Sequence, residues 1–306
     1  FTYRTLAVAV AAALVVPTQA TFAQDEKLTE EVVVIGTRTE GRSALDSPAP
    51  VDVIGGETMS NQGDTDMSNL LRNVVPSYNV NDQPISDAAT LVRPANLRGL
   101  APDHTLMLVN GKRRHRASVI TWLGNGISNG SQGPDAAAIP ALALKRIEVL
   151  RDGASAQYGS DAIAGVMNFV LNDAREGGSV EVRYGEYNEG DGEQVTIAGN
   201  IGLPLGDSGF LNLTAEWGES DPTSRSEQRA DAQGLIDDGY QNVPVPAMIW
   251  GRPIVSDDMK LWANFGVDLS DTLELYGHAN YNSKEVDGGF FFRNPTNRGA
   301  VYSGDG

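Results

Sequence analysis

The spacing of apolar residues changes near residue 175 of the sequence. Beyond this point apolar and polar residues alternate strictly over five stretches, which predicts β-strands with one apolar and one polar face. In the second stretch, for example, Val195 and Ile197 share one face, whereas Thr196 and Asn200 share the other. The five predicted strands are 179–184, 193–203, 209–219, 260–268 and 272–283.

The connections between these strands differ in length. Residues 204–208 and 270–271 form short turns, whereas 220–259 is long and polar. Strands of roughly 9–11 residues with short turns on one side and long loops on the other are typical of an outer-membrane β-barrel. A soluble β-sandwich is the alternative, because a half-buried antiparallel sheet shows the same alternation. We favour the barrel.

A barrel needs more strands than these five. Single-chain barrels have at least about eight strands, and an open sheet edge in lipid would leave backbone groups without hydrogen-bond partners. We therefore expect 173–306 to form only the first strands of a barrel that continues beyond residue 306.

Residues 45–172 have a mixed pattern that predicts a compact α+β domain. Met67, Leu70, Leu71 and Val74 recur at helical spacing, and Pro76 ends that helix, which we place at 64–75. The predicted strands are 51–54, 105–109, 146–150 and 166–171. A second short helix is predicted at 141–144.

The N-terminal segment has the features of a secretory signal peptide over residues 1–23. Arg4 precedes an apolar run, 6–16, and small residues follow up to Ala23. The run is too short to span a bilayer, which takes about 20 residues. The signal predicts a periplasmic or outer-membrane protein, and we interpret 24–44 as a periplasmic tether.

Charge and composition exclude several functions. The formal net charge is −17, which argues against nucleic acid as a partner. The one basic cluster, 111–116, is interpreted as a solvated loop. Cysteine is absent, the three histidines lack ligand spacing, and no nucleophile, base and acid are placed as a triad. The sequence therefore predicts no enzyme activity, no metal and no cofactor.

Two stretches resemble the plug domain of TonB-dependent outer-membrane receptors. They are LRGLAPDHTLMLVNGKRR (97–114) and IPALALKRIEVLRDGASAQYGSDAIAGVMNFVL (139–171), in the family's order and within 45–172. The resemblance implies an α+β plug domain followed by antiparallel transmembrane β-barrel strands, with the barrel incomplete in this chain. Such barrels have about 22 strands around a plugged lumen.

The same resemblance implies a function and a location. These receptors lie in the outer membrane of Gram-negative bacteria, bind lipid through the barrel, and actively import a scarce nutrient such as a ferric chelate, cobalamin or an oligosaccharide. Two alternatives remain open at this point. One is a passive porin-like channel, and the other is a periplasmic or surface binding module built on a β-sandwich.

A valine-rich run before the domain looks like a strand without a partner. The family has a TonB box at this place, which a TonB-type periplasmic energy-coupling protein captures as an added strand. An edge strand of the plug itself is the alternative. The predicted TonB box comprises Glu31, Val32, Val33, Val34, Ile35, Gly36, Thr37 and Arg38.

Three charged residues match positions that seal the plug against the barrel in the family. Arg98 and Arg151 correspond to arginines that pair with acidic residues of the barrel wall, and Glu148 is near them. Guanidinium groups suit this role because they bind carboxylates with two parallel hydrogen bonds. We expect the acidic partners beyond residue 306; ordinary surface arginines are the alternative.

Substrate contacts in this family come from plug apices and barrel loops. The corresponding plug segments here are the polar loop 81–96 and the glycine-rich loop 116–134. The candidate substrate-binding residues are Asn81, Arg116, Trp122, Asn125 and Asn129.

Overall fold

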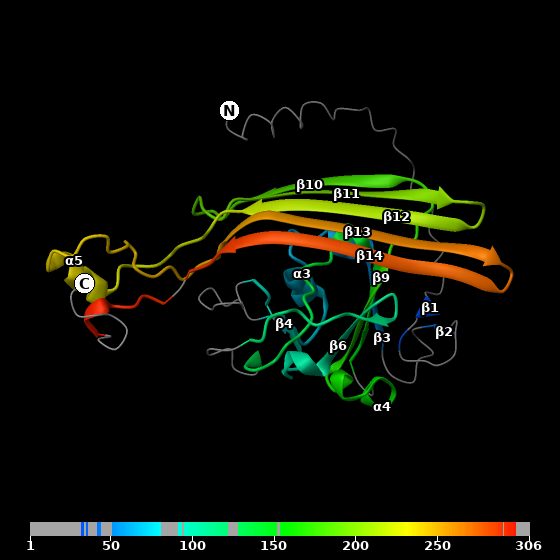
Figure 1. Ribbon diagram of the computed structural model, residues 1–306, viewed down its shortest axis with the longest axis horizontal. Coiled ribbons are helices and arrows are strands. Elements are labelled where there is room, and N and C mark those ends of the chain that lie inside the picture. The colour runs from blue at the N-terminus through cyan, green and yellow to red at the C-terminus, as the bar shows by residue number, and fades with distance from the viewer. Residues whose placement is uncertain are drawn as a thin grey trace, which may run out of the picture. The chain divides into compact units, whose positions relative to one another are not determined.

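Two five-stranded sheets form most of the regular structure in the computed structural model of the protein (Figure 1). From Val32 onward the chain forms one compact unit. The structure describes residues 32–33, 35, 42–43, 51–80, 91–93, 95–121, 128–151, 154–289 and 291–297. Among these residues, no helix is both long and apolar enough to cross a membrane.

The C-terminal sheet is an antiparallel meander whose strand order follows the chain. Its strands are β10 (Gly178–Gly185), β11 (Gln194–Leu205), β12 (Gly209–Ser220), β13 (Ile254–Ser270) and β14 (Leu273–Asp287). All five predicted strands are present. β13 begins six residues earlier than the predicted 260. The register shifts between Ser256 and Met259, where Asp257 has φ 49°. This irregularity interrupts the alternation of apolar and polar residues, so the pattern did not reveal the first part of the strand.

The connections of this sheet keep the predicted asymmetry. Residues 206–208 join β11 to β12, and 271–272 join β13 to β14. The connection 221–253 between β12 and β13 is long and contains helix α5 (Ala230–Asp237). Short turns therefore lie at one end of the strands and longer connections at the other.

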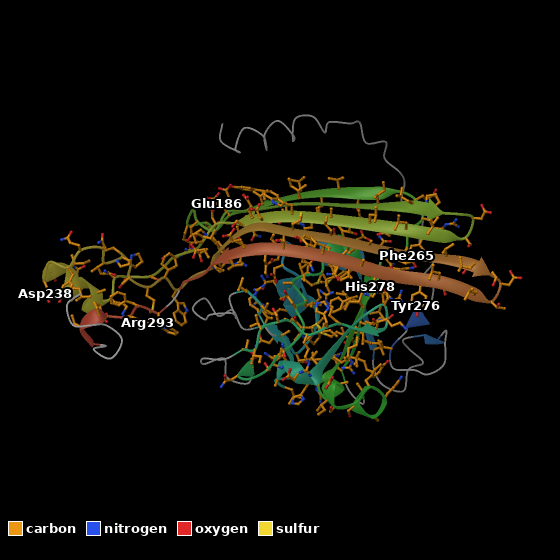
Figure 2. The ribbon with its side chains drawn as sticks, in the orientation of Figure 1. Glu186, Asp238, Phe265, Tyr276, His278 and Arg293 are labelled. Carbon is orange, nitrogen blue, oxygen red and sulfur yellow. The ribbon has the colours of Figure 1, made fainter. Side chains whose placement is uncertain are left out.

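In this sheet the apolar face is exposed and the polar face is buried, which is the reverse of the arrangement in a soluble sheet. Apolar Val180 and Leu273 are 75% and 56% exposed, whereas polar Asn212 and Thr214 are buried. In Figure 2, His278 and Tyr276 lie on the side of the N-terminal domain, which is the polar face. An apolar face left open to the surroundings suits contact with lipid, and this excludes the β-sandwich, whose apolar face would be packed inside.

The N-terminal domain is built on a mixed sheet with the order β3-β8-β9-β6-β7. Only β6 and β9 pair in parallel; the other neighbours are antiparallel. The strands are β3 (Val51–Gly55), β6 (Thr105–Val109), β7 (Lys112–Arg113), β8 (Leu144–Leu150) and β9 (Gly165–Leu171). The smaller elements are α2 (Gly56–Ser60), α3 (Met67–Val74), β4 (Tyr78–Val80), β5 (Ala95–Leu97), η3 (Pro102–His104), η5 (Ala141–Ala143), α4 (Ser155–Tyr158), η6 (Ser160–Ala162) and η7 (Pro295–Asn297), the last of which follows β14.

Two of these elements differ from the predictions in extent. Helix α3 begins at Met67 instead of residue 64, because the Asp66 side chain caps it and accepts hydrogen bonds from the amides of Ser68 and Asn69. The predicted helix 141–144 is the single 3-10 turn η5, since its last residue, Leu144, already begins strand β8.

The mixed sheet is buried on both faces, which explains the continuous apolar run of β6. Met107 and Val109 belong to a first hydrophobic cluster with α2 and α3. Leu106 and Leu108 point to the other face and belong to a second cluster. Trp262 of β13 is a member of the first cluster, so the C-terminal sheet packs against this face of the domain.

Candidate functional site

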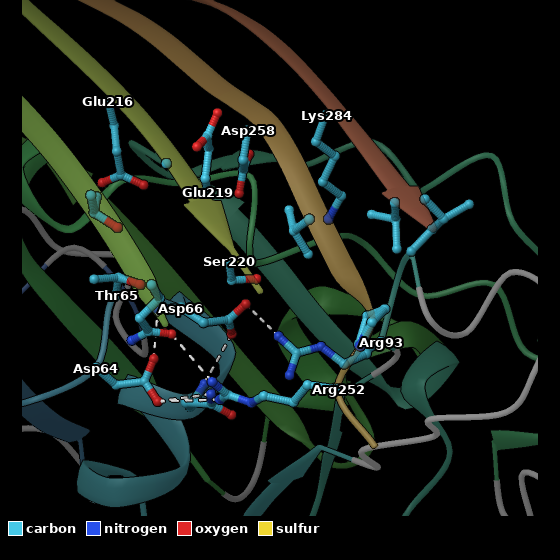
Figure 3. Close-up of a pocket in the computed structure, with 18 of the residues that line it drawn as sticks. Asp64, Thr65, Asp66, Arg93, Glu216, Glu219, Ser220, Arg252, Asp258 and Lys284 are labelled. Carbon is cyan, nitrogen blue, oxygen red and sulfur yellow. Dashed lines mark hydrogen bonds and ion pairs between the residues drawn. The ribbon is translucent and has the colours of Figure 1, made fainter. Parts of the chain in front are cut away.

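A cavity of about 410 Å³ lies between the N-terminal domain and the ends of strands β11–β14 that adjoin the longer connections (Figure 3). The domain contributes Asp64, Thr65, Asp66, Asn69, Leu91 and Arg93. The sheet and its connections contribute Tyr187, Gln194, Thr196, Glu216, Gly218, Glu219, Ser220, Trp250, Gly251, Arg252, Pro253, Val255, Asp258, Lys260, Lys284 and Val286.

The turn before α3 supplies the acidic side of the cavity. Asp66 caps the helix and forms an ion pair with Arg93. Asp64 accepts a hydrogen bond from Asn69 Nδ2 at 2.9 Å and faces Arg252 Nη2 at 4.0 Å. Burial alone would raise the pKa of Asp66, but the positive charges of Arg93, and then those of two lysines on the sheet, hold this pKa below its usual value.

Replacement of Asp66 is expected to destabilise the N-terminal domain. The Asp66→Ala variant should lose about 1 kcal/mol in the free energy of unfolding from the cap alone. Because the folded-state pKa is lowered, the charge of Asp66 stabilises fully above about pH 4, the ordinary value for aspartate, and this stabilisation is lost as the pH falls through the lower folded-state pKa. Denaturation of the complete receptor as a function of pH measures both effects.

The Asp66→Asn variant separates the two contributions. It keeps an oxygen that can cap α3 but removes the charge opposite Arg93. We expect it to be less destabilised than Asp66→Ala at neutral pH and to equal the wild type in strongly acidic solution. Equal stability of all three proteins at neutral pH would contradict this role of Asp66.

The sheet supplies a second group of charges. Lys260 Nζ lies 2.6 Å from Glu216 Oε1 on the paired strand and 3.5 Å from Asp258 Oδ2. The cavity lining contains five carboxylates (Asp64, Asp66, Glu216, Glu219 and Asp258) and four cations (Arg93, Arg252, Lys260 and Lys284). Most of these charges face an opposite charge, so the cavity suits a polar ligand that makes both donor and acceptor contacts.

The predicted substrate-binding residues do not line this cavity where the structure describes them. Arg116 is exposed, with Asp103 Oδ1 at 3.9 Å, and Asn129 is exposed in a turn. Asn81, Trp122 and Asn125 lie outside the described residues. The strand residues of the cavity could have been found from the alternation, which places Glu216 and Lys260 on the polar face; the acidic turn before α3 gave no comparable signal.

The predicted seal residues have partners inside the N-terminal domain. Arg98 donates to the carbonyl of Arg151 at 2.8 Å, and Arg151 forms an ion pair with Asp52 at 2.7 Å. Glu148 is fully buried and binds Arg146 at 2.8 Å and the Asn168 amide at 3.1 Å. Contacts of these residues with acidic groups of the barrel wall remain a prediction.

Part of the predicted TonB box is described by the structure. Val32–Val33 (β1) pairs with Arg42–Ser43 (β2), so this segment finds a partner within the tether and does not join the sheet of the domain. Ile35 is 1% exposed and belongs to the second hydrophobic cluster. Glu31, Val34, Gly36, Thr37 and Arg38 lie outside the described residues.

Comparison with known proteins identifies the class. Residues 43–166 match the family model of the TonB-dependent receptor plug domain. The chain is 28% identical over 204 residues to the iron-regulated outer membrane virulence protein of Vibrio cholerae, which is 65% of this chain and 29% of that protein. It is 29% identical over 259 residues to the vitamin B12 transporter BtuB of Photobacterium profundum, 84% of this chain and 38% of that protein.

Solved structures agree on the fold. The crystal structure of the ferric enterobactin receptor PfeA of Pseudomonas aeruginosa matches with a TM-score of 0.57 at 21% identity, over 78% of this chain and 33% of that one. The chain thus spans well under half the length of these relatives. By sequence and fold the chain is similar to TonB-dependent outer-membrane receptors of Gram-negative bacteria, with a plug domain of that family over residues 43–166 and antiparallel strands after it.

Proposed function

We propose that the complete protein is an energy-coupled transporter that imports a scarce nutrient across the outer membrane. The observation that carries this proposal is the orientation of β10–β14, whose polar face covers the α+β domain while its apolar face stays open. A passive channel needs no folded domain against its inner wall. The proposal involves no covalent chemistry.

The cavity provides the place where a substrate first meets both parts of the protein. It lies beside the longer connections of the sheet, which in this topology face the cell exterior. Its floor includes Asp64 and Asp66 of the plug, and its wall includes Arg252 and Lys260. A ligand that exchanges contacts with these charges would act on the plug and on the barrel at the same time.

Energy enters from the periplasmic side in this proposal. A TonB-type protein binds residues 31–38 as an added strand, after β1 separates from β2 and Ile35 leaves the second cluster. Four or five main-chain hydrogen bonds at about 0.5–1.5 kcal/mol each would hold this strand under load and still allow release.

The substrate is proposed from the relatives. Ferric enterobactin and vitamin B12 appear in the names of similar proteins, so a ferric chelate and cobalamin are two candidates. An oligosaccharide is a third candidate, because the cavity offers hydrogen-bond donors, acceptors and the rings of Tyr187 and Trp250.

Uptake measurements on the complete protein test the proposal. Cells expressing it should accumulate one of three labelled probes, ferric enterobactin, cyanocobalamin or maltoheptaose, and a protonophore that removes the inner-membrane potential should stop accumulation but not surface binding. Accumulation that continues without the potential would indicate a passive channel instead.

A further inference from the structure

The basic run Gly111–Arg116 is largely exposed, and the structure divides its cations between two surroundings. Lys112 Nζ lies 5.5 Å from the ring centroid of Tyr276, on strand β14. The Arg114 guanidinium lies 5.2 Å from the ring centroid of Trp262 on β13, and its Nη1 donates to Asn280 Oδ1 at 3.1 Å. Two cations of the plug thus contact aromatic rings of the barrel wall.

The other two cations of the run stay within the plug. Arg113 forms an ion pair with Asp161, and Arg116 lies 3.9 Å from Asp103. For residues 112–114 the division follows from the backbone, because successive side chains of an extended segment point to opposite sides. Residues 112 and 114 therefore face the wall, whereas residue 113 faces the plug.

Trp262 is the centre of this contact. It is only 4% exposed, is part of the first hydrophobic cluster of the plug, and donates from Nε1 to the carbonyl of Ala138 at 3.0 Å. Among the residues that the structure describes, no carboxylate of β10–β14 forms an ion pair with Lys112 or Arg114. The wall therefore offers these cations rings and an amide in place of negative charges.

An aromatic partner has a specific advantage in a contact that must open. A cation is attracted by the face of an aromatic ring, and when the two separate, the ring leaves no buried charge behind. Breaking a buried ion pair leaves an uncompensated carboxylate, which is costly. A contact between cations and rings can thus hold the plug at rest and still let it move.

We propose that Lys112 and Arg114 are positioning residues that fasten the plug reversibly to the barrel wall through Trp262 and Tyr276. This proposal goes beyond the transport function, since it needs only a plug inside a barrel and no identified substrate. It assigns a role to the one basic cluster of an acidic chain.

Two double variants of the complete receptor, matched in charge and position, test the fastening. Lys112→Gln/Arg114→Gln removes both wall contacts, whereas Arg113→Gln/Arg116→Gln removes the same charge from the same run but leaves the wall contacts in place. The purified receptors are inserted into planar bilayers, where ion conductance reports plug loosening. Hydrogen exchange of 105–114 in the same samples reports opening of this plug edge.

We expect Lys112→Gln/Arg114→Gln to raise the hydrogen-exchange rate of 105–114 and the frequency of open-channel events about tenfold. Arg113→Gln/Arg116→Gln should resemble the wild type in both measurements. Arg114→Lys, which keeps a cation near the ring, should remain near the wild type, while Arg114→Gln should not. Equal behaviour of the two double variants, or of Arg114→Lys and Arg114→Gln, would overturn the proposal. If the first double variant fails to assemble, the single variants decide the question by the same measurements.

Discussion

Deletion of residues 31–37 from the complete receptor is expected to abolish energy-dependent uptake while substrate binding at the cell surface stays intact. The segment is the predicted attachment point for the coupling protein, and its main-chain groups supply the strand pairing on which force transmission depends. The cavity lies between the plug and the longer connections, and Ile35, whose side chain the structure describes, is not among the residues that line it. Uptake and binding of a labelled substrate, measured on the same cells, separate the two steps.

The neighbouring tether offers a control of the same length. Deletion of 24–30 shortens the tether equally but keeps Val32–Val33 and Ile35, so uptake should persist. A finer variant replaces Val33 by proline, which removes one backbone donor from the strand. Uptake that persists after deletion of 31–37 would refute the assignment of the TonB box.

The Arg146→Met variant is expected to lower the free energy of unfolding of the plug by about 3–5 kcal/mol, because it removes a guanidinium that contacts a buried carboxylate. Glu148 is fully buried, and Arg146 contacts its Oε1 through both Nε, at 2.9 Å, and Nη2, at 2.8 Å. The amide of Asn168 stays as a partner but carries no charge. Denaturant titration of the complete receptor, followed by hydrogen exchange of β8 and β9, gives the change.

The adjacent residue is a matched control for this variant. Lys145 points to the other side of β8 and pairs with Asp173 at 3.0 Å, where both side chains are 47% exposed. Lys145→Met should therefore cost less than about 1 kcal/mol. The double variant Arg146→Met/Glu148→Leu should recover much of the lost stability, since it removes the buried carboxylate together with the guanidinium. Similar effects of Arg146→Met and Lys145→Met would show that the pair is not a stabilising core contact.

Local patterns predicted the longer strands of both sheets and helix α3. The alternation in β11 and β12 placed Asn200 and Thr214 on the polar face, and both are buried there. The helical spacing from Met67 to Val74 coincides with α3. These predictions succeeded because strand and helix periodicity depends on neighbours a few residues apart. The start of β13 was missed, since the bulge near Asp257 breaks that periodicity.

The candidate site was harder to predict than the elements. The cavity combines Asp64 of the plug with Arg252 and Lys260, which lie almost 200 residues later in the chain. Glu148 was predicted near the plug–wall seal, and the structure places its side chain with Leu150 on the face of the mixed sheet opposite the cluster that contains Trp262. Face assignment in a sheet that is buried on both sides cannot be taken from alternation, because both faces are apolar.

The sequence by itself predicted the five strands of the C-terminal sheet and which of their faces are polar, and it predicted an α+β domain before them. Only the tertiary structure decided which charges meet. It divided the basic run between the plug and the wall, and paired Arg114 with Trp262 across about 150 residues of sequence. The reason is physical: periodicity fixes the direction of a side chain relative to its own backbone, whereas its partner depends on how separate sheets pack against each other.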